Sequence, residues 1–171
     1  IDELLLENFV LFQPKDIVSG DFYWVGKQGD YTFFAVCDCT GHGIPGAFMS
    51  MIGTVLLNEI ILIDGETSTK KILDRMRLQI INSLNQKGKQ GESKDGMDMM
   101  LCRYDEKNNK LLYTGAYNTL LHISEGEVAV LKGDRRPVGY FKGMDIPFTE
   151  HSIDVKYGDR VYLFSDGYPD Q

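Results

Sequence analysis

The segment from Ala35 to Gly46 constrains the fold of this chain more than any other part of the sequence. It reads A-V-C-D-C-T-G-H-G-I-P-G, an apolar run typical of a buried strand that ends in Asp38 and continues into glycines. A long apolar helix then begins at Pro45, a residue suited to a first helical turn. The strand holds Asp38 in place, and the small residues that follow leave its carboxylate accessible. Two interpretations fit these letters: a carboxylate that binds metal, or a glycine loop that binds phosphate.

The phosphate-loop interpretation rests on three glycines with the G-x-G-x-x-G spacing of dinucleotide-binding folds, Gly41, Gly43 and Gly46. That fingerprint requires a strand–helix–strand unit, whereas the apolar spacing over residues 69–84 predicts a second helix. Three residues also separate the end of the strand from the first glycine. A dinucleotide-binding domain is therefore the weaker interpretation.

Two distant segments favour the metal interpretation. Near the start, S-G-D-F-Y-W places Asp21 after a Ser-Gly pair and before residues of strand type. Near the end, R-V-Y-L-F-S-D-G is an apolar strand that closes on Asp166 and a glycine. A single Asp beside glycine is common in turns. Three of them favour a shared cation, because carboxylates that a fold brings together repel one another unless a cation lies between them.

These motifs resemble a known family. S-G-D-F-Y-W, D-C-T-G-H-G-x-P-G-A-F-M-S and L-F-S-D-G-Y are similar to motifs of the SpoIIE/RsbU-like bacterial branch of the PPM metal-dependent Ser/Thr protein phosphatases. The resemblance covers nearly all of the chain, and residues 118–121 and 136–139 fall where the family has its N-P-P-L and P-L-G elements. It implies an α+β fold, an αββα sandwich of two antiparallel sheets flanked by helices, and the hydrolysis of phosphoserine or phosphothreonine on a protein in bacterial signalling.

The resemblance implies a site with two divalent cations, either Mn²⁺ or Mg²⁺. Asp38 would bridge both ions, and the backbone carbonyl of Cys39 would bind one of them. Asp21 would complete the protein ligands of that ion, and Asp166 would bind the other. Hard oxygen donors suit these metals, and no cluster of His and Cys in the sequence argues for zinc. A water that bridges the two cations loses a proton near neutral pH and can attack phosphorus.

Three further residues have two interpretations each. His42 could donate a proton to the departing alkoxide, since an unperturbed imidazole titrates near neutral pH, or could be a structural side chain in a tight loop. Asp98 interrupts the apolar series of residues 97–101 and could support an additional metal ion, although we expect it to face solvent at the strand start. Lys15 could contact phosphate, but an ordinary surface lysine is the simpler expectation.

The family pattern continues beyond the Asp-Gly strand to a terminal D-D-[MIV] motif, one acid of which binds the same ion as Asp166. This sequence ends at Gln171, before any such motif. We therefore expect residues 1–171 to form a single phosphatase domain that is truncated at the C-terminus and has little activity in that form. A catalytically inactive binding module with the same fold, a pseudophosphatase, is the alternative from another functional class.

The net charge and the cysteines limit which partners and which cellular location are plausible for this chain. The net charge of −7 and the pI of about 4.9 argue against nucleic acid or an anionic membrane as partner, because both would repel the chain. An odd number of cysteines in apolar strands favours reduced thiols in a cytoplasmic protein. We see no signal peptide and expect no membrane insertion. In relatives the substrate is often a phosphorylated STAS-type anti-anti-sigma regulator, and a dimer could form through an upstream sensor region.

Hydrophobic periodicity places two helices among many short strands. The helix over residues 45–63 is apolar around most of its circumference, so we expect it to be largely buried except for a narrow polar stripe of Ser50, Thr54 and Asn58. The helix over residues 69–84 is amphipathic, and residues 1–12 are expected to form a short helix that runs into a strand. Further strands are predicted at residues 17–26, 31–37, 97–101, 110–115, 119–123, 127–131, 147–155 and 160–164.

Overall fold

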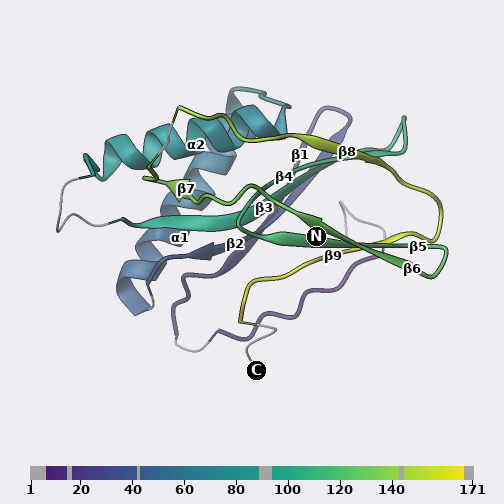
Figure 1. Ribbon diagram of the computed structural model, residues 1–171, viewed down its shortest axis with the longest axis horizontal. Coiled ribbons are helices and arrows are strands. Elements are labelled where there is room, and N and C mark those ends of the chain that lie inside the picture. Colours follow the sequence, from purple (N-terminus) through teal and green to yellow (C-terminus); the bar gives the residue numbers. More distant parts are fainter. Residues whose placement is uncertain (1–6, 15–16, 42, 89–93, 143–144, 168–171) are drawn as a thin grey trace.

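The chain forms two antiparallel β-sheets, with helices packed against the larger one (Figure 1). The structure is a computed structural model that describes residues 7–14, 17–41, 43–88, 94–142 and 145–167. The larger sheet, sheet A, has the strand order β1-β2-β3-β4-β8, and the short strand β7 pairs with β3. The smaller sheet, sheet B, has the order β6-β5-β9.

The elements have the following bounds. Sheet A contains β1 (Phe22–Gln28), β2 (Tyr31–Cys39), β3 (Gly96–Asp105), β4 (Lys110–Ala116), β7 (Val138–Gly139) and β8 (His151–Asp154). Sheet B contains β5 (Thr119–Ser124), β6 (Glu127–Lys132) and β9 (Arg160–Leu163). The helices are α1 (Gly43–Leu57), its π-helical continuation η1 (Asn58–Ile63) and α2 (Thr69–Ser83).

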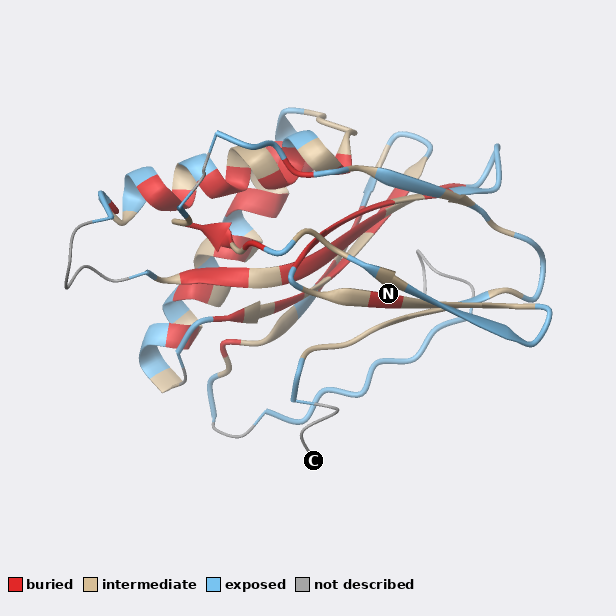
Figure 2. Cartoon of the chain, viewed as in Figure 1, coloured by how far each residue is buried: buried red, intermediate tan, exposed pale blue. Residues whose placement is uncertain are grey.

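The core has two parts, because successive side chains of a strand point to opposite faces of a sheet. On one face of sheet A, residues such as Ala35 and Leu101 pack under the helices against Leu57, Ile60 and Met76. On the other face, Met100, Cys102 and Tyr113 pack against Leu120 of sheet B. Figure 2 shows the buried residues concentrated on the strands of sheet A and on the helix faces that cover it, while β6 is mostly exposed.

The predicted α+β sandwich of two antiparallel sheets is confirmed, and most predicted elements are present. The helices cover one face of sheet A; among the described residues, none lies on the outer face of sheet B. Two boundaries matter for the site. Strand β1 begins only at Phe22, so residues 17–21 lead into it as a loop, and β2 continues through Cys39, which places Asp38 inside the strand.

The N-terminal segment differs from its prediction. Residues 7–14 form neither helix nor strand, and residues 1–6 lie outside the described part of the chain. The segment is instead held by aromatic contacts, since the ring of Phe9 lies 6.2 Å from that of Tyr162 and the ring of Phe12 lies 5.8 Å from that of Tyr23. The predicted short helix is therefore wrong for residues 7–12.

The first helix lies where it is predicted, but it is less buried than its composition suggests. Its polar stripe faces inward: Ser50 Oγ donates to the carbonyl of Ser19 (3.2 Å), and Trp24 Nε1 donates to Asn58 Oδ1 (2.9 Å). Its outer side carries large apolar residues that are each at least 59% exposed, Ile44, Phe48, Met51 and Val55. The expectation of a largely buried helix is wrong, because one side of the helix stays exposed, while Ser50 and Asn58 hydrogen-bond on the inner side.

By length and composition alone, the helix over Gly43–Ile63 could also cross a membrane, with a mean hydropathy of 1.8 over its most apolar window. It is the one helix of this kind in the described part of the chain. This is weak support for a membrane span, because the core helix of a soluble protein meets the same criteria. Here the inner face packs into the core on sheet A, through residues such as Met49, Leu56 and Leu57.

Candidate metal centre

Strand alternation turns Asp38 away from the helices. Its neighbours Cys37 and Cys39 are buried in the core under the helices. Asp38 therefore points to the opposite face of sheet A, the face on which Phe34 packs into the core between the two sheets. The carboxylate thus lies at the end of the inter-sheet layer, where the apolar side chains of β2 stop.

Asp98 lies directly opposite Asp38 on the neighbouring strand β3. Its neighbours Met97 and Met99 point toward the helices, so Asp98 points to the same face of sheet A as Asp38. The expectation that Asp98 faces solvent at the strand start is wrong, because the residue is half-buried and lines the same pocket as Asp38. Two acids directly opposite each other on neighbouring strands are unfavourable unless one is protonated or a cation offsets their charge.

Asp21 and Asp166 come from the loop before β1 and the loop after β9, and a hydrogen bond joins these loops. Ser165 Oγ donates to Asp21 Oδ2 at 2.7 Å. The backbone N–H of Asp21 donates to Ser19 Oγ at 3.0 Å, which fixes the turn that leads into β1. These contacts bring the first and last strands of the described chain to the site of Asp38.

The glycines around Asp38 allow three backbone segments to touch. A Cβ atom built on Gly46 would lie 2.6 Å from the carbonyl oxygen of Gly41 and 3.0 Å from the Cα of Gly20. One built on Gly20 would lie 2.9 Å from the same oxygen of Gly41. The start of α1, the loop after β2 and the loop before Asp21 therefore meet at a junction that has no room for side chains.

The dinucleotide-binding interpretation of Gly41, Gly43 and Gly46 is wrong. The strand before the glycines, β2, pairs antiparallel with both β1 and β3, and two helices separate β2 from β3. The parallel strand–helix–strand unit that the fingerprint requires is thus missing around these glycines. Gly46 is instead required by close backbone packing, whereas Gly41 and Gly43 adopt positive φ angles of +88° and +63°.

The acids line a pocket of about 180 Å³ between the ends of the two sheets. Its walls are formed by Asp38, Asp98, Tyr117, Asn118, Thr119, Phe164, Ser165 and Asp166. Burial, and then the nearby charges and carboxyl contacts of Asp21 and Asp166, raise the pKa of Asp38 to about 8. Burial and the charge of Asp166 raise the pKa of Asp98 to about 6. A positive charge in this pocket would stabilise the ionised forms of both carboxyl groups.

The donor set fits a hard divalent cation. Carboxylate and carbonyl oxygens are the ligands that Mg²⁺ and Mn²⁺ prefer. In the described part of the chain, no group of three or more His, Cys, Asp and Glu side chains is arranged so that it could hold a metal ion as it stands. After burial, the nearby carboxyl groups of Asp21 and Asp166 are what raise the pKa of Asp38. This mutual influence is the more informative observation, because it places the three carboxyl groups near one another, and a divalent cation binds several carboxylate oxygens at once.

Cys39 can contribute only its backbone. Its thiol is buried in the core under the helices, and burial, followed by the charges of Asp38 and Asp21, raises its pKa to about 12. The side chain therefore stays protonated and is a poor metal ligand. Its carbonyl oxygen lies against Gly20, because a Cβ built on Gly20 would come within 3.1 Å of it. The carbonyl oxygen of Cys39 thus lies beside Gly20, the residue that directly precedes Asp21.

The structure leaves some predicted residues undescribed and adds others. His42 and Lys15 lie outside the described residues. The sequence interpretation missed Ser165, which orients Asp21, and the turn of Tyr117 and Asn118, which forms one wall of the pocket. The repeated pairing of Ser with the predicted acids, in S-G-D and S-D-G, was the available signal for the serine.

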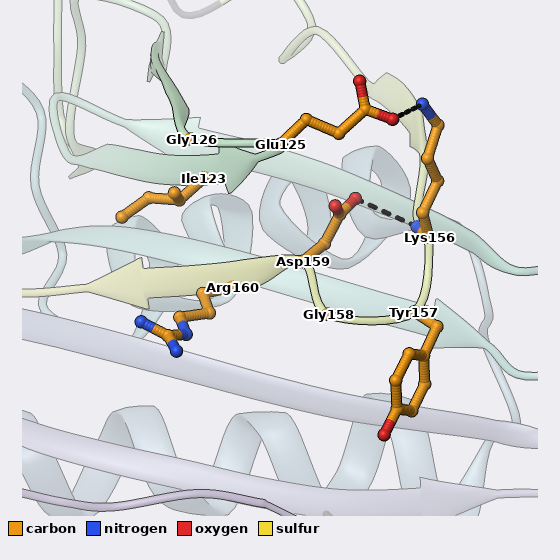
Figure 3. A pocket seen from close by; sticks show the side chains of 8 residues that line it. All are labelled: Ile123, Glu125, Gly126, Lys156, Tyr157, Gly158, Asp159 and Arg160. Carbon is orange, nitrogen blue, oxygen red and sulfur yellow. Dashed lines mark hydrogen bonds and ion pairs between the residues drawn. The ribbon is translucent and has the colours of Figure 1, made fainter.

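A larger hollow, of about 390 Å³, lies at the other end of the β5–β9 pair (Figure 3). Its charges are largely paired with one another: Lys156 Nζ donates to Glu125 Oε1 (2.7 Å), and the N–H of Lys156 donates to Asp159 Oδ2 (2.9 Å). Asp159 also contacts His122 Nε2 at 2.9 Å. These contacts fix the turn before β9, and we assign no binding function to this hollow.

Comparison with known proteins assigns the family. The model of the family described as "Stage II sporulation protein E (SpoIIE)" matches residues 28–171, which is most of the chain. The chain belongs to the SpoIIE family. The resemblance to the SpoIIE/RsbU-like branch of the PPM phosphatases is thereby confirmed. A search of curated proteins found no match.

Solved structures agree with this SpoIIE-family fold. The SiaA-PP2C domain of Pseudomonas aeruginosa is 31% identical with a TM-score of 0.83, and the match covers 95% of this chain but 62% of that one. The PP2C phosphatase domain of SpoIIE from Bacillus subtilis, solved with a fragment of its regulatory domain, is 20% identical with a TM-score of 0.65, covering 84% and 40%. RsbX, solved in complex with magnesium, is 15% identical with a TM-score of 0.68, covering 92% and 71%.

Proposed function

We propose that this SpoIIE-family chain belongs to a metal-dependent phosphatase that hydrolyses phosphoserine or phosphothreonine on a protein substrate. The observation that carries the proposal is that Asp38 and Asp166 line one pocket, while Asp21, bound by the pocket residue Ser165, lies close enough to raise the pKa of Asp38. The raised pKa of Asp38 supports it, since a gathered set of carboxyl groups without a positive partner is unfavourable.

At such a site, each of these residues would have a separate role. Asp38 would bind both of two Mn²⁺ or Mg²⁺ ions, with Asp21 and the Cys39 carbonyl on one ion and Asp166 on the other. Ser165 holds Asp21 in place through its 2.7 Å hydrogen bond. When bound, the ions would supply an activated water and positive charge at the phosphoryl group. His42 is proposed as the proton donor to the leaving serine or threonine oxygen.

The proposed substrate is a phosphorylated regulatory protein in a bacterial cytoplasm. A STAS-type anti-anti-sigma regulator is the class that the family resemblance favours. The net charge of −7 supports a protein over nucleic acid as partner. A dimer formed through an upstream sensor region is part of the same proposal.

Metal-dependent turnover of a phosphoserine peptide by the full-length protein tests this function. We expect phosphate release with Mn²⁺ and no measurable release after chelation with EDTA, because the described pocket walls contain no lysine or arginine to offset phosphoryl charge. A phosphotyrosine peptide serves as the control substrate and should be turned over more slowly.

Two results would count against the proposal. Equal phosphate release with and without EDTA would exclude the metal-dependent mechanism. Tight Mn²⁺ binding without any turnover of phosphoserine or phosphothreonine peptides would favour the pseudophosphatase alternative.

A further inference from the structure

The turn between β4 and β5 forms the wall of the pocket that carries no acid. Tyr117, Asn118 and Thr119 line this wall, whereas the three acids that line the pocket come from β2, β3 and the loop after β9. No lysine or arginine is among the described residues that line the pocket. The donors that this wall offers to an anionic group are therefore neutral.

Backbone hydrogen bonds clamp this turn to the segment at residues 133–134. The N–H of Tyr117 donates to the carbonyl of Asp134 (2.8 Å), and the N–H of Gly133 donates to the carbonyl of Asn118 (3.0 Å). The clamp depends on close backbone contact, because a Cβ built on Gly133 would lie 2.5 Å from the carbonyl carbon of Gly115. The turn is consequently a fixed part of the pocket.

Tyr117 adopts an unfavourable backbone conformation. Its φ of +54° lies in the left-handed region that non-glycine residues rarely adopt. Such conformations persist where the surrounding structure imposes them, and they concentrate at functional sites. Tyr117 directly precedes Asn118, so its backbone conformation determines the position of the Asn118 Cα atom, from which the side chain extends.

One contact fixes the orientation of the Asn118 amide. The backbone N–H of Thr119 lies 2.7 Å from Asn118 Oδ1. An N–H can only donate, so the atom it contacts must be the oxygen, and the amide cannot be flipped. The Nδ2 amino group, which has no hydrogen-bond partner among the described residues, is the end that remains to bind a ligand.

We propose that Asn118 positions the phosphoryl group, with Nδ2 donating a hydrogen bond to a non-bridging oxygen of the phosphoserine or phosphothreonine substrate. This inference rests on the proposed phosphatase function. A neutral donor suits this wall, because a lysine or arginine here would form ion pairs with Asp38, Asp98 or Asp166 and compete with the cations for them. The amide orients the phosphoryl group and leaves the carboxylates to the metal.

Two substitutions separate this role from a structural one. Asn118→Asp keeps the Oδ1 acceptor for the N–H of Thr119, removes the donor and adds a negative charge, whereas Asn118→Ala removes the donor and the acceptor without adding charge. With Mn²⁺ bound to offset the added carboxylate, we expect Asn118→Asp to keep the melting temperature of the wild type. We expect both Asn118→Asp and the uncharged Asn118→Ala to lose at least about tenfold in affinity for inorganic phosphate, measured by calorimetry with Mn²⁺ present. kcat/KM for a phosphoserine peptide should fall by a similar factor.

The Mn²⁺ affinity of each variant is measured alongside, because Asn118→Asp adds a carboxylate and should not weaken Mn²⁺ binding. Asn85 is exposed and lies away from the pocket, so Asn85→Asp makes the same chemical change elsewhere. This variant should have the phosphate affinity and the kcat/KM of the wild type. Unchanged phosphate affinity and unchanged kcat/KM in the uncharged Asn118→Ala would overturn this assignment while leaving the phosphatase function intact. A wild type that never hydrolyses phosphopeptides would instead refute the proposed function, and the phosphate affinities would still decide whether Asn118 binds the anion.

Discussion

Asp38→Ala is expected to reduce Mn²⁺-dependent hydrolysis of a phosphoserine peptide by on the order of 10³-fold or more. The reason is that both Asp21 and Asp166 lie close enough to Asp38 to raise its pKa, so the loss of Asp38 removes the group shared by the two proposed ion sites. Without metal, the same change should leave the melting temperature equal to or above that of the wild type. Removing one of several crowded carboxyl groups relieves burial cost and repulsion.

This combination of lost activity and retained stability distinguishes a functional residue from a structural one. Asp154→Ala is the matched control, because Asp154 is an exposed acid whose ion pair with Lys110 is long (3.7 Å). We expect that variant to keep full activity. Activity of Asp38→Ala within tenfold of the wild type would contradict the assignment of Asp38 as the shared ligand.

Gly46→Ala is expected to destabilise the protein by about 1–3 kcal/mol and to abolish metal-dependent activity. Helix propensity alone predicts the opposite sign, since alanine is favoured over glycine inside a helix by about 1 kcal/mol. The new Cβ would lie 2.6 Å from the carbonyl oxygen of Gly41 and 3.0 Å from the Cα of Gly20. Both neighbours are backbone, so α1 or the loop before Asp21 must move. Differential scanning calorimetry and the phosphopeptide assay measure the two effects.

Gly43→Asn provides the comparison for this substitution. Gly43 also lies at the start of α1, but a Cβ there meets no atom within 4 Å, and asparagine tolerates its φ of +63°. The variant should cost less stability than Gly46→Ala and should keep activity. A Gly46→Ala protein that is more stable than the wild type and fully active would show that the backbone junction does not position the site.

The acids at the site could be predicted from the sequence because each has the same local signature. Asp21, Asp38 and Asp166 all lie at or beside a strand end near glycine, and that pattern does not depend on which strands pair. The two antiparallel sheets could likewise be expected from the family resemblance. The fold then brings together the three aspartates that this local pattern identifies.

Features that depend on register or on orientation could not be predicted in this way. Asp98 faces the pocket only because β3 pairs with β2 in a register that places it opposite Asp38. The helix over residues 43–63 is apolar on nearly all sides, so its composition reveals neither which side packs on the sheet nor that its polar stripe faces inward. The orientation of Asn118 depends on a hydrogen bond to its neighbour that no residue pattern encodes.

Calorimetric titration with Mn²⁺ tests the central claim most directly, namely that three distant aspartates form one cation-binding site. Single Asn substitutions of Asp21, Asp38 and Asp166 preserve side-chain shape and remove one charge each. We predict saturable Mn²⁺ binding by the wild type and a loss of at least about tenfold in affinity, or about 1.4 kcal/mol, in each of the three variants. Asp154→Asn should bind like the wild type. Mn²⁺ affinity that is unchanged in all three variants would contradict the account.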